Sequence, residues 1–157
     1  FKAETIQILY PKKQGLNGLE EALDTVILQI EKALDNKKNI IILSDRGVNQ
    51  ELAPIPALLA CSFVNHQLNR LRKRSYFDIV IESAEPREPH HFATLFGYGA
   101  SAVNPYMVNE IIRMQVKEGF ITDMDEQKAV DTFNTAIGKG ILKVMNKIGI
   151  STLHSYR

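Results

Sequence analysis

Charged side chains follow two of the strands that the sequence predicts, at the point where each strand ends. Asp45 closes the run NIIILSD and Arg46 follows it, while Glu82 lies near the end of the run FDIVIES and Glu85 comes two residues after it. The carboxyl ends of parallel strands share one edge of a sheet, so these four side chains are expected to face one another. Carboxylates beside a guanidinium can act as an acid–base or anion-binding group. The same residues also suit a structural ion-pair network with loop caps, and we favour that interpretation.

A second group of side chains, in the segment REPHH, has the types that bind metals. Glu88 and His91 have a spacing that places both on one face of a helix, as in carboxylate-bridged metal sites. Those sites need a second motif of the same kind, which the sequence lacks. The neighbours His90 and His91 would point about 100° apart on a helix. We therefore predict a packing and hydrogen-bonding role for the two rings, with one of them facing the core, and no metal site.

The segment Gly97-Tyr98-Gly99 looks like a glycine turn for a dinucleotide. Such a turn must follow a strand and precede a helix. Here the predicted helix comes first and the short strand SAV comes afterwards. We therefore predict a connection at the opposite edge of the sheet, where Gly97 supplies a left-handed helix cap and Gly99 allows close packing.

The rest of the chain alternates predicted strands with amphipathic helices. Strands are predicted at 3–11, 39–45, 77–83 and 101–103, and helices at 19–35, 54–71, 90–96, from 104 onward, and at 126–147, with a strand-like tail at 149–157. This order predicts an α/β fold with a parallel sheet. An open doubly wound sheet and a partial barrel both remain compatible with it. Because four short βα units are half of an eight-fold barrel, we predict a rudimentary, partial TIM-barrel-like domain.

The overall composition excludes several classes of partner. The 157 residues include 19 basic and 18 acidic side chains, so the net charge of +1 gives no reason to expect nucleic acid or an anionic membrane. No run approaches the ~20 apolar residues of a membrane helix. The single cysteine, Cys61, lies among apolar residues and is expected to be buried. These features favour the cytoplasm.

Several long segments of the chain together point to one protein family. The segments NIIILSDRGVNQELAPIPALLA, REPHHFATLFGYGASAVNPYM and GKGILKVMNKIGISTLHSYR, with the leading FKAETIQILYP and GLEEAL, resemble the central domain of glutamate synthase, in its glutamine-using large subunit. The resemblance covers essentially the whole chain, in order. It implies residues 1–148 as the C-terminal part of that domain, and 149–157 as the connection into a following FMN barrel.

The resemblance also implies a parent enzyme that makes glutamate from glutamine and 2-oxoglutarate. An amidotransferase domain would release ammonia, and an internal tunnel would carry it to an FMN barrel with an iron–sulfur cluster. A reductase subunit or ferredoxin would supply electrons. The family's catalytic, cofactor-binding and metal-binding residues match no position of this chain, so a linking domain without its own cofactor is expected. The alternative is a stand-alone α/β enzyme or a domain that binds a phosphorylated metabolite through Asp45, Arg46 and Glu82.

Overall fold

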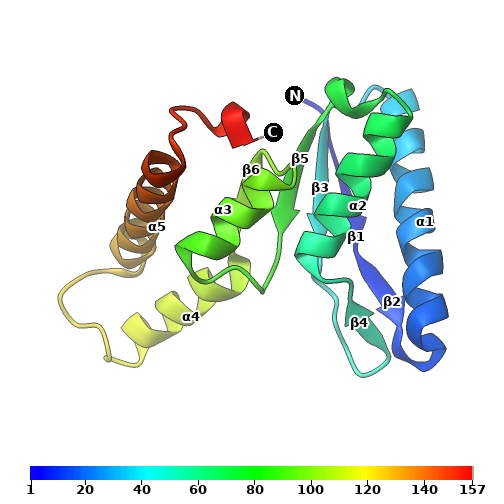
Figure 1. The fold of residues 1–157 in the computed structure, drawn as a ribbon. Coiled ribbons are helices and arrows are strands. Elements are labelled where there is room, and N and C mark those ends of the chain that lie inside the picture. Colours follow the sequence, from blue (N-terminus) through cyan, green and yellow to red (C-terminus); the bar gives the residue numbers. More distant parts are fainter. Residues whose placement is uncertain (157) are drawn as a thin grey trace.

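A four-stranded parallel sheet forms the centre of the molecule in a computed structural model, in which residues 1–156 are described (Figure 1). Its strands are β1 (Ala3–Gln7), β3 (Ile40–Ser44), β5 (Asp78–Glu82) and β6 (Ala102–Asn104), in the spatial order β1-β3-β5-β6. The spatial order of these four strands therefore follows their order in the chain. The prediction of an α/β fold with a parallel sheet is confirmed.

Five helices accompany the sheet in residues 1–156. They are α1 (Gly15–Asp35), α2 (Ala57–Arg70), α3 (Pro89–Gly97), α4 (Tyr106–Lys117) and α5 (Glu126–Ile148). None of them is both long and apolar enough to cross a membrane. Helix α1 begins at Gly15, four residues before the predicted start.

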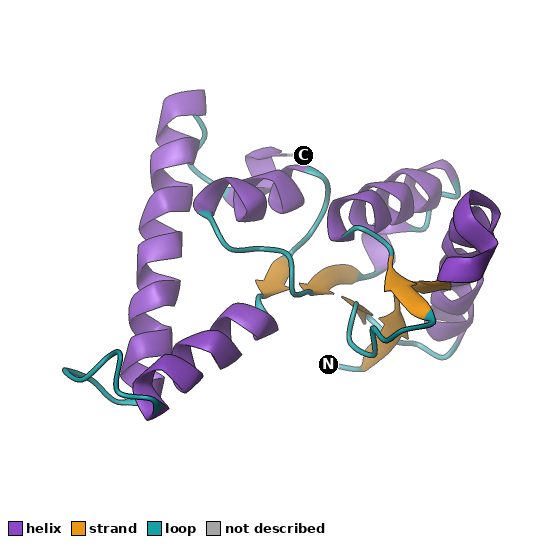
Figure 2. Cartoon of the chain, turned by 90° about the horizontal axis from the view of Figure 1, so that it is seen from below, coloured by secondary structure: helices purple, strands orange, loops and turns teal. Residues whose placement is uncertain are grey.

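The two faces of the sheet differ in their cover. The register and alternation of the strands place five buried side chains on one face: Ile6, Ile41, Leu43, Ile79 and Ile81. Helices α1, α2 and α3 lie on this side (Figure 2). The other face carries Thr5, Ile42, Val80 and Ala102 in one continuous row across the four strands. Two of these four side chains are exposed and two are half-buried.

The segment predicted as the first strand, residues 3–11, forms two strands that belong to different sheets. Strand β2 (Leu9–Pro11) pairs in the antiparallel direction with β4 (Leu52–Pro54). Pro54 therefore lies in a strand, whereas the sequence predicted it in the first turn of a helix. A proline is tolerated there because the two-stranded sheet consists of edge strands only.

Helices α4 and α5 form a hairpin beside the β6 edge of the sheet (Figure 1). Helix α5 is continuous through Gly138 and Gly140, and it packs closely on α3. A Cβ atom at Gly140 would lie 2.5 Å from Cγ of Pro89. The absence of a side chain therefore sets the distance between the two helices.

Two predicted details of the chain's second half are wrong. The segment predicted as a strand-like tail, residues 149–157, contains a 3₁₀ helix at Leu153–Tyr156. The last residue of the chain, Arg157, lies outside the described part. The connection from α3 to β6 is at the predicted edge of the sheet, but Gly97 is still helical. Of these two glycines only Gly99 has a positive φ, of 115°, and a Cβ atom there would lie 2.6 Å from Cγ of Asn65.

Candidate functional site at the carboxyl edge of the sheet

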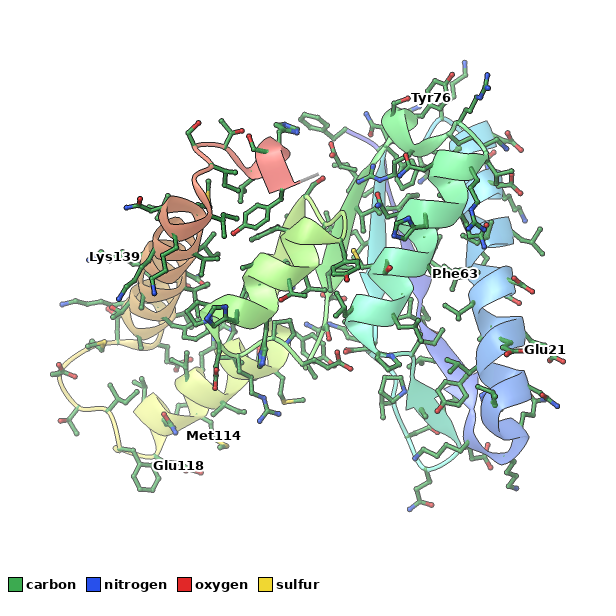
Figure 3. The ribbon with its side chains drawn as sticks, in the orientation of Figure 1. Glu21, Phe63, Tyr76, Met114, Glu118 and Lys139 are labelled. Atoms are coloured by element: carbon green, nitrogen blue, oxygen red, sulfur yellow. The ribbon has the colours of Figure 1, made fainter. Side chains whose placement is uncertain are left out.

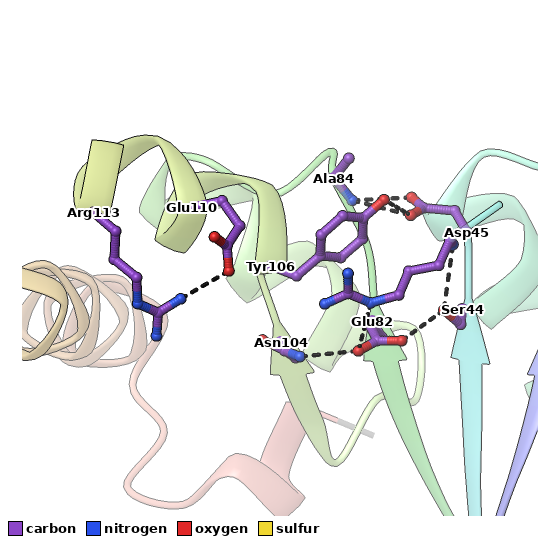
Figure 4. A network of polar contacts seen from close by, with 9 residues as sticks. Ser44, Asp45, Glu82, Ala84, Asn104, Tyr106, Glu110 and Arg113 are labelled. Atoms are coloured by element: carbon purple, nitrogen blue, oxygen red, sulfur yellow. Dashed lines mark hydrogen bonds and ion pairs between the residues drawn. The ribbon is translucent and has the colours of Figure 1, made fainter. Parts of the chain in front are cut away.

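The ends of β3 and β5 bring three of the four predicted side chains together (Figure 4). Ser44 and Glu82 occupy paired positions of neighbouring strands, and Glu82 also pairs with Asn104 of β6. Asp45 and Arg46 follow Ser44 directly. The pairing of parallel strands therefore fixes the position of this cluster, as the sequence predicted.

The Asp45 carboxylate is buried and accepts hydrogen bonds from three groups. Its Oδ2 accepts from the Ser83 hydroxyl at 2.6 Å and from the Ala84 backbone N–H at 3.0 Å. Its Oδ1 accepts from the Tyr106 hydroxyl at 2.8 Å. Only 2% of Asp45 is exposed to solvent. Such a carboxylate is held in place and satisfied within the protein.

The Glu82 carboxylate also accepts from three side chains. The Ser44 hydroxyl donates to Oε2 at 2.6 Å, while Arg46 Nε and the Asn104 amide donate to Oε1 at 3.1 and 3.2 Å. Burial by itself would raise the pKa of Glu82, but the hydrogen bonds from Ser44 and Arg46 outweigh it and hold the pKa below its usual range. Glu82 is therefore ionised at neutral pH.

Tyr106, the first residue of α4, connects the two carboxylates. Its ring lies under the Arg46 guanidinium, whose central carbon is 3.9 Å from the ring centroid. Burial, followed by the hydrogen bond to Asp45 and the charge of that carboxylate, raises the pKa of Tyr106 to about 12. The phenol is therefore a hydrogen-bond donor at neutral pH and fixes the start of α4 to the end of β3.

Glu85, the fourth predicted residue, is directed to another element. Its Oε2 accepts from the backbone N–H of Ala57, the first residue of α2, at 3.0 Å. Pro56 precedes this helix and provides no capping side chain. A carboxylate from the loop after β5 thus caps α2, where a free helix end would attract a phosphate.

The two histidines at the start of α3 are both exposed, so the expectation that one ring faces the core is wrong. The Arg87 backbone N–H donates to Nδ1 of His91 at 3.1 Å, in agreement with a hydrogen-bonding role. Among residues 1–156, the side chains of His, Cys, Asp and Glu form no group of three that could hold a metal ion. Cys61 is fully buried, as expected.

These contacts limit the chemistry of the cluster. Both carboxylates already accept hydrogen bonds from protein groups, and the N-terminus of α2 is occupied by Glu85. Two negative charges beside one guanidinium also oppose the binding of a phosphate, because the sum of the charges is negative. The residues of this cluster therefore do not fit the phosphate of FMN or of another phosphorylated ligand. Sequence reasoning missed Ser83 and Tyr106, although Tyr106 follows β6 at the same edge.

Comparison with known proteins identifies the family. The model of the glutamate synthase central domain matches the chain over residues 1–157. The chain belongs to the glutamate synthase central-domain family. This confirms the resemblance on which the expected function rests.

Three relatives show how widely this domain is shared. The chain is 40% identical over 157 residues to the large chain of the NADPH glutamate synthase of Bacillus subtilis, covering 100% of this chain and 10% of that protein. It is 39% identical over 158 residues to the NADH glutamate synthase of Schizosaccharomyces pombe, covering 100% and 8%. It is 34% identical over 170 residues to the ferredoxin-dependent glutamate synthase of Spinacia oleracea, covering 99% and 10%. The chain thus spans a tenth or less of the length of these relatives.

Proposed function

We propose that the chain is a structural, linking part of a glutamate synthase that forms glutamate from glutamine and 2-oxoglutarate. The observation that carries this proposal is the family match over the whole chain. The strand-end cluster supports it, since Asp45 and Glu82 are engaged in holding strands and α4 together and neither is free for acid–base work. The fragment itself performs no catalysis.

In this proposal the domain joins the amidotransferase and FMN-barrel domains of the same parent chain. It holds their two active sites in register and contributes to the wall of the ammonia tunnel. Residues 1–148 form the domain, and 149–157 connect it to the FMN barrel. The sequential strand order and the helices on a single face of the sheet support a partial TIM-barrel-like arrangement, because a doubly wound sheet has helices on both faces.

The cofactors and the electron donor belong to other parts of the parent. FMN and an iron–sulfur cluster are bound outside this chain, and the parent acts in the cytoplasm. The relatives' names include NADPH, NADH and ferredoxin at 34 to 40% identity, so similarity in this domain does not select a reductase subunit or ferredoxin as the partner.

The experiment compares Asp45→Asn with Asp24→Asn in the full-length parent. Asp24 is exposed on α1 and serves as the control for the same chemical change. Glutamine hydrolysis, glutamate formation from added ammonia, and the coupled reaction are measured separately. For a linking domain, Asp45→Asn leaves both half-reactions active and lowers the yield of glutamate per glutamine hydrolysed. Loss of one half-reaction by on the order of 10²-fold would instead make Asp45 a catalytic acid or base.

A titration of FMN into the 157-residue chain tests the same proposal independently. Because the α2 N-terminus is capped by Glu85 and the cluster has a net negative charge, we expect no change in FMN fluorescence. Saturable quenching at micromolar FMN would contradict a domain without a cofactor.

A further inference from the structure

One face of the four-stranded sheet, the open face, has no helix of residues 1–156 packed over it (Figure 2). Its central row is formed by Thr5, Ile42, Val80 and Ala102, which the register places side by side. Ile40, Ile42 and Val80 are half-buried but do not join the hydrophobic core, whose members from β3 and β5 are on the opposite face. Apolar, β-branched side chains thus lie on a surface that no helix of the described residues covers (Figure 2).

The charged side chains beside this row already have partners within the chain. Glu82 in the neighbouring row is paired with Arg46, and Asp78 at the other end accepts from the Ser101 hydroxyl at 2.6 Å. A strongly charged partner therefore gains little here. The surface suits apolar side chains with hydroxyl or amide groups at the margin, where Gln7 and Asn104 can form hydrogen bonds.

The size of the face argues against a second copy of the chain as the occupant. Four strands about 4.8 Å apart, with five residues rising about 3.3 Å each, give a face of roughly 300 Å². A stable complex of separate molecules buries about 800 Å² on each partner. A covalently attached segment needs less area, since its effective concentration at the face is high.

One general rule and one observation indicate what covers the open face. Parallel sheets occur almost only with both faces covered. The matched relatives are at least ten times longer than this chain, because it spans 10% or less of each. We propose that the open face is a docking surface for a segment of the same parent polypeptide outside residues 1–157, which lays apolar side chains across Thr5, Ile42, Val80 and Ala102. This inference rests on the proposed function only in taking the chain as part of a longer protein.

Cysteine labelling tests the proposal. Thr5→Cys and Ala102→Cys place a thiol at two exposed positions of the row, one on each edge strand. Each variant is labelled with a maleimide in the 157-residue chain and in the full-length parent, and peptide mass spectrometry follows the modified residue. Labelling of the same variants unfolded in urea gives the reaction rate of an unprotected thiol. The native Cys61, which is fully buried on the covered side, is the slow reference in both proteins, and Asp24→Cys is the fast reference in the isolated chain.

We expect both new thiols to react at least tenfold more slowly in the full-length parent than in the 157-residue chain. Slowing of less than tenfold at both positions would overturn the proposal. Protection that appears in the 157-residue chain as its concentration rises would also overturn it, in favour of a second copy. Glutamate synthesis by the same full-length variants is assayed in parallel. Protection without activity would remove the proposed function alone, and activity with unprotected thiols would remove this inference alone.

Discussion

The two faces of the parallel sheet carry similar side chains in different surroundings. Ile81 has no exposed surface, while its neighbour Val80 in the same strand is half-buried on the other face. Helix α4 resembles the open face, since none of its residues is buried and 49% of Met114 is exposed (Figure 3). Apolar residues therefore stabilise this chain only where a second element covers them. Apolar residues that no element covers can instead contact another segment of polypeptide.

The largest difference between the two faces is expected in the free energy of unfolding. Ile81→Ala should lower it by about 3 kcal/mol in the 157-residue chain, because a fully buried side chain leaves a cavity. Val80→Ala should lower it by about 1 kcal/mol or less, because less apolar surface is removed from burial. Urea denaturation followed by circular dichroism measures both. Equal losses for the two variants would show that the open face is packed within this chain.

The packed and unpacked sides of α5 offer a second pair of variants. Gly140→Ala should lower the free energy of unfolding by about 1–3 kcal/mol, because the new methyl group meets the rigid ring of Pro89. Gly138→Ala has nothing within 4 Å and should raise it by roughly 0.5–1 kcal/mol through higher helix propensity. Thermal and urea unfolding give the two signs. If Gly140→Ala is also stabilising, α3 and α5 do not approach as closely as described.

A smaller effect is expected where the carboxyl edge of the sheet meets α4. Tyr106→Phe should lower the free energy of unfolding by about 1.5 kcal/mol at neutral pH, because the buried Asp45 carboxylate loses one hydrogen-bond donor. The pKa of Tyr106 in the folded protein, about 12, is above the unfolded value of about 10. Its contribution to stability is thus complete below about pH 10 and is lost as the pH rises towards 12.

The measurement is the free energy of unfolding of both proteins between neutral and strongly alkaline pH. The difference between them should shrink as the pH approaches 12. Tyr76→Phe, which changes an exposed tyrosine, is the control and should show no such trend. A difference for Tyr106→Phe that stays constant with pH would contradict the role of its hydroxyl.

The sequence predicted most of the sheet and its helices for clear physical reasons. The runs NIIILS and FDIVIE are rich in the β-branched residues that favour strands, and the apolar period of α1 extends over several turns. Strand β4 was missed because three residues ending in proline have no pattern of their own. Pairing with β2, and the bond from the Ile55 N–H to the Ile8 carbonyl, make it a strand.

The candidate site divides in the same way. The chain positions of Asp45, Arg46 and Glu82 predicted their meeting, since parallel strands align their carboxyl ends. The partner Tyr106 is 61 residues from Asp45 in sequence, and its contact depends on the direction in which α4 leaves β6. No local pattern encodes that direction. The same holds for Glu85, which could serve the cluster or cap α2 until the loop places it on Ala57.

The sequence by itself determined the alternation of strands and helices, the burial of Cys61 and the membership of a family, because these follow from local patterns and from residue identity. Only the tertiary structure decided which face of the sheet is covered, which glycine must remain a glycine, and which carboxylate holds which donor. Those outcomes depend on contacts between segments far apart in the chain. Each such contact depends on how whole helices and strands pack. A short stretch of sequence contains only one of the two segments that meet.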